Sequence, residues 1–232
     1  MAEDKQTEHF RSLEALITKS DESALVENPW YMLVALVYTV KRKYADLVAL
    51  SKYVLYRDPS LSVDEKRRIL RRIREALYKN GVLYGNPVMI NAMLELRKGL
   101  DAELFEDTAY RDHKKPLEDL ETNGYDVFKR TYGDTTDEVV GLLKNVHPDY
   151  PYSALTLIFG PVLGFYDILN PAETSLTMVA ALIAFDLPLQ AKWHLNGAYR
   201  NGATKEEVLS ARALIIEVLG ANDADIPSLD IA

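Results

Sequence analysis

Apolar residues recur at helical spacing along almost the whole of this 232-residue chain, and this periodicity constrains the fold more than any other feature. In one segment Ile69, Leu70, Ile73 and Leu77 lie at intervals that place them on a single face of a helix. We find no run of strict apolar and polar alternation, bounded by turn residues, that would indicate a strand. The pattern therefore predicts an all-α fold.

Capping residues and prolines indicate where several helices begin. One long helix is predicted from Pro29 to Tyr56, with the proline in its first turn. Ser62 with Glu65 three residues later has the pattern of a capping box, and Thr204 with Glu207 repeats it. The other expected helices cover residues 8–18, 21–27, 63–83, 87–100, two helices within 125–145, 152–168, 172–185, 188–201 and 205–219.

The composition allows two packed units in one chain. Hydrophobic residues make up 48% of the sequence, enough to bury a sizeable core. The segment 101–124 is charged and carries turn signals, so it is the expected linker. We predict an N-terminal helical half over residues 1–124, with a degenerate repeat, and a C-terminal half over residues 125–232.

The two halves share one sequence plan. Each contains a capped acidic helix start, an apolar helix, a short break that ends in proline and a second helix that ends near glycine. Pro87 and Pro188 occupy corresponding places, and Met93 falls where the second copy has His194. The plan predicts two degenerate helical hairpins that pack on each other.

Charge argues against nucleic-acid and membrane partners. The net charge is −8 and the isoelectric point is about 5.1, so the overall field does not attract phosphate backbones or anionic lipids. Residues 66–74 hold six basic side chains in nine, but an apolar stripe runs beside them, so they are read as a solvated face. The most apolar stretches, 154–169 and 176–189, are too short for a membrane span.

The chain has no cysteine. Disulfides, thiolate metal sites and thiol peroxidase chemistry are therefore excluded. No pair of its four histidines has metal-ligand spacing, and we find no glycine-rich phosphate loop or dinucleotide motif. We expect neither a metal nor a cofactor. Since neither end reads as a targeting segment, we expect a soluble protein of the cytoplasm, with the mitochondrion or the peroxisome as alternatives.

A helix that begins at Pro188 carries the main candidate for chemistry. Gln190 and His194 are four residues apart and share a face, whereas Trp193 points about 100° away from His194. A neutral imidazole is suited to proton transfer near neutral pH. Gly202 then favours a left-handed helix stop.

The segments "ETSLTMVAALIAF" and "HLNGAYRNGATKEEV" together resemble the carboxymuconolactone decarboxylase and alkylhydroperoxidase D-like superfamily. The likeness covers about residues 150–219, and "REALYKNGVLYGNPVMINAMLEL" is similar to the N-terminal half of fungal-type members. The resemblance implies an alkylhydroperoxidase D-like helical fold. It also implies a homo-oligomer, a dimer or higher, because members pair their helical hairpins across subunits.

Departures from the superfamily pattern limit the chemistry that the resemblance implies. Members that reduce peroxides carry Cys-x-x-Cys-x-x-x-His, and here Leu187 and Gln190 stand in the two thiol positions. Ser175 stands where those members carry a glutamate, with Glu173 two residues earlier. With these departures, the resemblance implies a cofactor-free lyase or isomerase-type enzyme. Such an enzyme would act on a small organic acid or lactone, with His194 as proton carrier.

The other site residues follow from what such an enzyme needs. Gln190 would donate to an enolate oxygen, and Arg200 or Lys192, whichever turns inward, would attract a substrate carboxylate. Ser175, Trp193 and Tyr166 are the further substrate-binding candidates, with Tyr166 at the pocket mouth.

A structural reading of the same residues stays open. A helical histidine is often a packed, hydrogen-bonded residue, Gln190 could satisfy a buried polar neighbour, and Trp193 could fill a core or an oligomer interface. The alternative function is therefore a noncatalytic structural or ligand-binding descendant of the superfamily. An open pocket at His194 would favour the enzyme, whereas enclosure of the ring by apolar side chains would favour the noncatalytic descendant.

Overall fold

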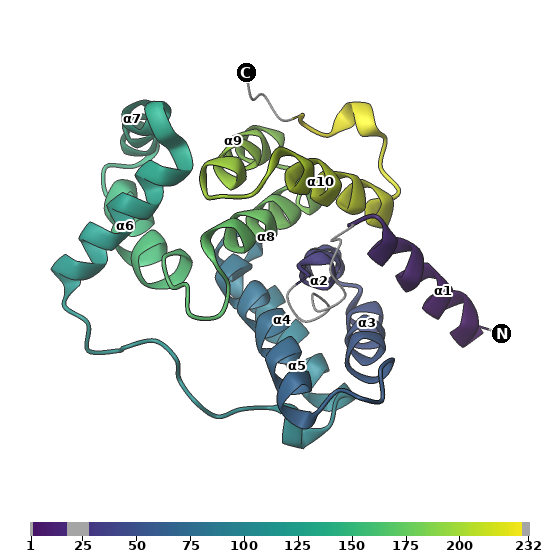
Figure 1. The fold of residues 1–232 in the computed structure, drawn as a ribbon. Coiled ribbons are helices and arrows are strands. Elements are labelled where there is room, and N and C mark those ends of the chain that lie inside the picture. The colour runs from purple at the N-terminus through teal and green to yellow at the C-terminus, as the bar shows by residue number, and fades with distance from the viewer. Residues whose placement is uncertain (1, 18–27, 229–232) are drawn as a thin grey trace.

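The computed structural model describes residues 2–17 and 28–228, and these residues are almost entirely helical (Figure 1). No strand occurs among them, so the predicted all-α fold is confirmed. The helix expected over residues 21–27 lies outside the described residues. The α-helices are α1 (Ala2–Ala15), α2 (Trp30–Val40), α3 (Tyr44–Tyr56), α4 (Val63–Tyr84), α5 (Asn86–Gly99), α6 (Leu117–Tyr132), α7 (Thr136–Val146), α8 (Pro171–Ala184), α9 (Pro188–Arg200) and α10 (Lys205–Leu219).

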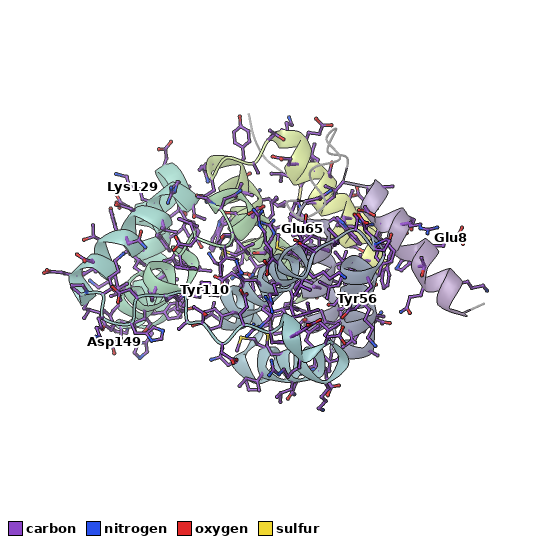
Figure 2. All side chains as sticks on the ribbon, turned by 60° about the horizontal axis from the view of Figure 1, so that its bottom comes forward. Glu8, Tyr56, Glu65, Tyr110, Lys129 and Asp149 are labelled. Carbon is purple, nitrogen blue, oxygen red and sulfur yellow. The ribbon has the colours of Figure 1, made fainter. Side chains whose placement is uncertain are left out.

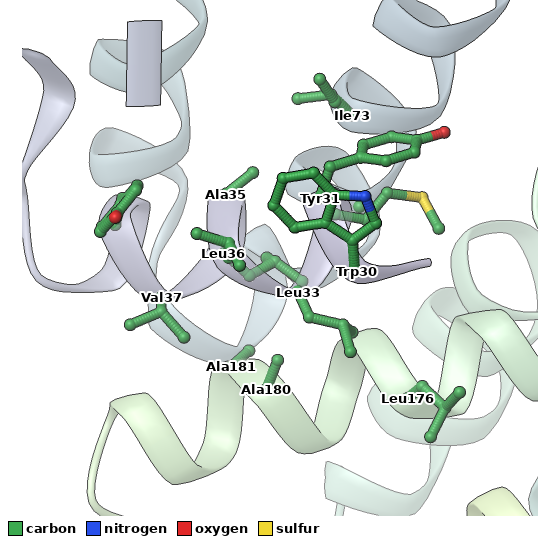
Figure 3. Packing of buried hydrophobic residues seen from close by; sticks show 14 of the residues in the cluster. Trp30, Tyr31, Leu33, Ala35, Leu36, Val37, Ile73, Leu176, Ala180 and Ala181 are labelled. Atoms are coloured by element: carbon green, nitrogen blue, oxygen red, sulfur yellow. The ribbon is translucent and has the colours of Figure 1, made fainter. Parts of the chain in front are cut away.

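Helix α2 forms the centre of the larger hydrophobic core. Its sequence, "WYMLVALVYTV", is apolar on every side, and such a helix is stable only when other elements surround it. Helices α3, α4, α8 and α10 pack around α2. Figure 3 shows Ala180 and Ala181 of α8 against α2, and Ile73 of α4 near Tyr31. The small side chains of α8 allow it to approach α2 closely.

The prediction of one helix from Pro29 to Tyr56 is wrong. Helix α2 ends at Val40 and α3 begins at Tyr44. The three residues between them are basic and exposed, and Arg42 has a φ of 58°. A continuous helix would carry these charges along the core, so the chain turns at the surface instead.

The two helical hairpins expected from the sequence are present. Helices α4 and α5 meet at Gly85, whose φ is 98°, and α8 and α9 meet around Asp186, whose φ is 60°. Helix α4 packs against α8, so the hairpins contact each other. The division into residues 1–124 and 125–232 stays a prediction, and its junction lies inside α6, while the larger core combines helices from both sides.

A second, smaller core holds α6, α7 and a π-helix at Tyr152–Leu163 together. Figure 1 shows α6 and α7 at one side of the molecule, reached through the long connection after α5. The backbones of α6 and the π-helix nearly touch: a Cβ built on Gly124 would lie 1.9 Å from the carbonyl oxygen of Leu155. The smaller core therefore requires glycine at this crossing. Its buried members are Val127, Phe128, Tyr132, Val139, Phe159, Leu163 and Met178.

Three polar side chains satisfy the carbonyl groups at the end of the π-helix. Asn123 donates to the carbonyl oxygens of residues 160 and 164, and Arg111 to those of residues 161 and 162. Lys79 donates to the carbonyl oxygens of residues 163 and 165. Helix ends need such partners, because their last carbonyl groups have none within the helix. Among the described residues, no helix is both long and apolar enough to cross a bilayer.

Candidate functional site

His194 lies inside the protein, on α9, with 4% of its surface exposed. Its Nε2 atom is 3.3 Å from the hydroxyl oxygen of Tyr132 on α6, and its Nδ1 atom is buried without a hydrogen-bond partner among the described residues. Burial lowers the pKa of His194 from 6.5 to about 4. The ring is therefore neutral at pH 7, and the imidazolium that would serve as a general acid is scarcely populated there.

Gln190 and Trp193 both precede the buried histidine on α9. Gln190 is half-buried, and its side chain makes no hydrogen bond within the described part of the chain, so the expected pair with His194 is not formed by a hydrogen bond. Trp193 packs edge-on against Tyr132, with ring centroids 6.1 Å apart. It also lines an open cavity of about 380 Å³ beside α7.

Ser175 and Arg200 hold helices together. The side chain of Asn201 donates to the hydroxyl of Ser175 at 3.0 Å and to that of Thr131 at 3.1 Å, which ties α8 to α6. Arg200 donates to the backbone carbonyl oxygen of Thr131 at 3.1 Å. It thereby satisfies a carbonyl group in the last turn of α6, a helix end that favours a positive charge.

Tyr166, like Trp193, packs against the smaller core. Its ring faces the ammonium of Lys79 at 5.1 Å and the guanidinium of Arg130 at 5.6 Å. Of the six predicted site residues, then, Trp193 and His194 share a contact with Tyr132, whereas Ser175 and Arg200 meet through Thr131 and Asn201. Their roles in binding or catalysis stay predictions.

A buried polar network lies between α4 and α8. Arg72 donates to the carboxylate of Glu173 at 2.6 Å, and Asn80 donates to the hydroxyl of Thr177 at 3.0 Å. Lys79 has no exposed surface, and it donates to the hydroxyl of Thr174 as well as to the carbonyl oxygens of the π-helix. Burial lowers the pKa of Lys79 to about 7.

Arg72 shows that the prediction of a solvated face for the basic residues of 66–74 is only partly right, and the neighbouring Glu75 is buried as well. Arg72 is 3% and Glu75 is 5% exposed. Arg72 borders the face on which Ile69 and Ile73 pack into the core, whereas Glu75 lies on the side of α4 that Arg111 and the connection after α5 cover. Both buried charges are accommodated because Glu173 supplies the opposite charge for Arg72 and Arg111 supplies it for Glu75.

A cavity of about 290 Å³ lies beside this network, and we call it the arginine pocket. Helix α4 forms one wall, and the connection between α5 and α6, where Tyr110 is labelled in Figure 2, forms another. Met93 of α5, Ala109 and Ile168 supply its apolar lining. Its charged and aromatic lining consists of Arg71, Arg74, Glu75, Tyr78, Tyr110, Arg111 and His113.

Two of the three arginines of the pocket are held by carboxylates. Arg71 forms a bidentate salt bridge with Glu106, and Arg111 forms a bidentate salt bridge with Glu75. Arg74 differs, because its guanidinium contacts the ring of Phe105 at 5.5 Å and has no carboxylate partner in the described ranges. The pocket therefore offers one uncompensated positive charge, in a half-buried position where solvent screens it incompletely.

Sequence reasoning did not find this pocket. The basic run on α4 is visible in the sequence, but its spacing does not show that Arg74 lines a pocket, because the opposite wall comes from the connection between α5 and α6. Arg111 and His113 lie in a charged segment that was assigned to a linker. They reach α4 only because the connection runs beside that helix, where Arg111 pairs with Glu75 and contacts the ring of Tyr78.

Comparison with known proteins identifies two relatives, both named Peroxisomal protein 2. The relative from Schizosaccharomyces pombe is 36% identical over 150 residues, which cover 65% of this chain and 70% of that protein. The relative from Saccharomyces cerevisiae is 29% identical over 174 residues, which cover 65% of this chain and 62% of that protein. No family model matches the chain, and no solved structure matches it significantly. The resemblance to the carboxymuconolactone decarboxylase superfamily therefore stays a prediction.

These findings correct two predictions. The lyase or isomerase-type function is wrong, because the relatives carry a name that gives a cell compartment and no reaction, and because His194 is buried and neutral. The cytoplasm, the first choice for location, finds no support in those names. The peroxisome was among the alternatives.

Proposed function

The chain belongs to the family of Peroxisomal protein 2, and on that premise we propose that it acts in the peroxisome as a binding protein for a small organic anion. The observation that carries the proposal is the guanidinium of Arg74, which lines the arginine pocket without a carboxylate partner in the described ranges. A half-buried charge of this kind gains more from an anionic ligand than an exposed one does, because less water competes for it. No chemical step is assigned to the site.

The remaining lining fits the same ligand class. Thr108, Tyr110 and His113 supply polar groups for hydrogen bonds, while Met93 and Ile168 supply an apolar wall. Ligand sites commonly combine an apolar wall with a few fixed polar groups. A cavity of about 290 Å³ corresponds to roughly ten water molecules, so the enclosed part of the ligand has about ten non-hydrogen atoms.

Binding of benzoate to the purified protein tests this proposal. Benzoate combines a carboxylate with a small apolar body, and isothermal titration calorimetry measures its dissociation constant. Loss of a hydrogen bond to a charged group costs about 1.5–3 kcal/mol, so Arg74→Gln should weaken binding by about tenfold to a hundredfold. Arg68→Gln is the control, since it removes the same charge from an exposed position on α4. Equal affinities of the two variants would refute the proposed site.

The location has its own test. A fluorescent fusion that leaves both ends of the chain native, with the fluorescent protein inserted in the exposed turn at residues 147–149 after α7, should coincide with a peroxisomal marker in yeast cells. Diffuse fluorescence in cells with intact peroxisomes would count against it. Self-association of the chain also stays a prediction, and sedimentation velocity measures it directly.

A further inference from the structure

We infer that the arginine pocket selects ligands with a single negative charge, of the carboxylate type, over dianions such as phosphate monoesters. This inference rests on the proposed function, because it concerns the same pocket. It follows from the charges that line the pocket and from the partners that already hold them.

Arg71 does not contribute a free charge. Its Nε atom donates to one carboxylate oxygen of Glu106 at 2.8 Å, and its Nη2 atom donates to the other. The pair raises the pKa of Arg71 and lowers that of Glu106, so both groups stay ionised. Two parallel hydrogen bonds in this geometry are among the stronger polar contacts in proteins. A ligand would have to break them to gain the guanidinium.

Arg111 is held even more completely. Its Nη2 atom donates to Glu75 at 2.5 Å and to the carbonyl oxygen of Val162, and its Nε atom donates to that of Pro161 at 2.9 Å. The guanidinium also lies between the rings of Tyr78 and Phe165, at 4.7 and 4.3 Å. Arg111 is therefore part of the wall, and its charge is balanced by the carboxylate of Glu75.

Arg74 is left as the one permanent charge of the lining that no carboxylate within residues 2–17 and 28–228 compensates. A carboxylate would neutralise it. A dianion would bring a second negative charge close to Glu75, which itself lines the pocket, and this charge would have no partner. An unpaired charge in a partly desolvated site is unfavourable, so the second charge should lower the affinity rather than raise it.

Benzoate and phenyl phosphate form a matched pair of probes, because they share the ring and differ in the charged group. At pH 7.5 benzoate carries one negative charge and phenyl phosphate carries close to two, since the second pKa of such phosphates is about 6. We expect benzoate to bind the native protein at least about fivefold more tightly, a difference near 1 kcal/mol. Tighter binding of phenyl phosphate would overturn the inference.

Glu106→Gln provides the decisive variant. It keeps the shape of the side chain but frees the charge of Arg71, so the ratio of the two affinities should move toward phenyl phosphate by about fivefold or more. Glu103→Gln is the matched control, because it removes one negative charge from an exposed position on the same connection, outside the lining. Equal ratios in the two variants would overturn the inference. If Glu106→Gln does not fold, the same ratio is measured in Arg71→Gln, where the unpaired Glu106 should move it toward benzoate.

Failure of the selectivity is distinguishable from failure of the proposed function. If both probes bind, and Arg74→Gln weakens both, the pocket is an anion site whatever the ratio. If neither probe binds the native protein, the proposed function fails and the selectivity fails with it.

Discussion

The guanidinium of Arg72 in α4 donates a 2.6 Å hydrogen bond to the carboxylate of Glu173 in α8, although 101 residues separate them in the chain. Arg72 also donates to the hydroxyl of Tyr31 in the central helix α2 at 3.0 Å. Glu173 accepts a hydrogen bond from the backbone N–H of Asn170 in the capping box of α8. One buried ion pair thus joins the two helical hairpins to the centre of the core.

Arg72→Met should strongly destabilise the protein. The carboxylate of Glu173 would remain buried without its counter-charge, and breaking a buried pair in this way costs about 3–5 kcal/mol. Arg67→Met is the control, because Arg67 pairs with Asp64, whose side chain is 89% exposed, and such a pair contributes at most about 1 kcal/mol. Urea denaturation measures both free energies of unfolding. Similar losses in the two variants would contradict the role of this pair.

The buried state of His194 predicts a pH dependence of stability. Burial lowers its pKa from 6.5 to about 4, so between these values the unfolded chain binds a proton that the folded chain does not. Above about pH 6.5 the ring is largely neutral in both states, so the free energy of unfolding keeps its full value. As the pH falls from 6.5 toward 4, protonation of the unfolded chain lowers the free energy of unfolding. Between pH 7 and pH 5 the resulting loss in the free energy of unfolding is about 2 kcal/mol.

Comparison of variants isolates this contribution. His194→Gln does not titrate, so its free energy of unfolding should fall by about 2 kcal/mol less than that of the native protein when the pH is lowered from 7 to 5. His147→Gln is the control, because the side chain of His147 is 65% exposed. If His194→Gln keeps the native pH dependence, the ring is not held neutral by burial.

Lys79 is predicted to stabilise the junction of α4, α8 and the π-helix. Lys79→Met removes the donor for the carbonyl oxygens of Leu163 and Phe165 and for the hydroxyl of Thr174. Buried acceptors without a donor cost about 1–3 kcal/mol each, so we expect a loss of at least about 2 kcal/mol. Thermal unfolding measures it against Lys98→Met, whose side chain is exposed on α5. A melting temperature equal to that of the control would contradict the assignment.

Gly124→Ala tests the close crossing of α6 and the π-helix. The added Cβ would lie 1.9 Å from the carbonyl oxygen of Leu155, so the backbones must separate, and overpacking of this kind costs about 1–3 kcal/mol or more. Gly141→Ala in α7 is the matched control, because its Cβ would meet no atom within 4 Å. Alanine there should leave stability unchanged or raise it by up to about 1 kcal/mol. Chemical denaturation measures the free energy of unfolding of both variants. Equal values would exclude a tight crossing of α6 and the π-helix.

Local signals in the sequence determined much of the helical framework. The capping boxes at Ser62 and Thr204 form as predicted, because each depends on residues three positions apart. Gly202 adopts a φ of 102°, as expected for a helix stop. The apolar periodicity predicted the all-α fold class, because the residues that form one buried helical face lie three or four positions apart in the sequence. The break between α2 and α3 was missed, because it depends on where the core ends.

The candidate site depended on tertiary structure. The sequence placed His194 on a helix beside Gln190, but burial by Tyr132, 62 residues away, made the ring neutral and enclosed. It showed the basic residues of α4, but only the path of the connection after α5 decided that Glu106 and Glu75 hold Arg71 and Arg111, while Arg74 has no carboxylate partner among the described residues. Helix formation depends on residues a few positions apart, whereas burial and charge pairing depend on elements that the folded chain brings together.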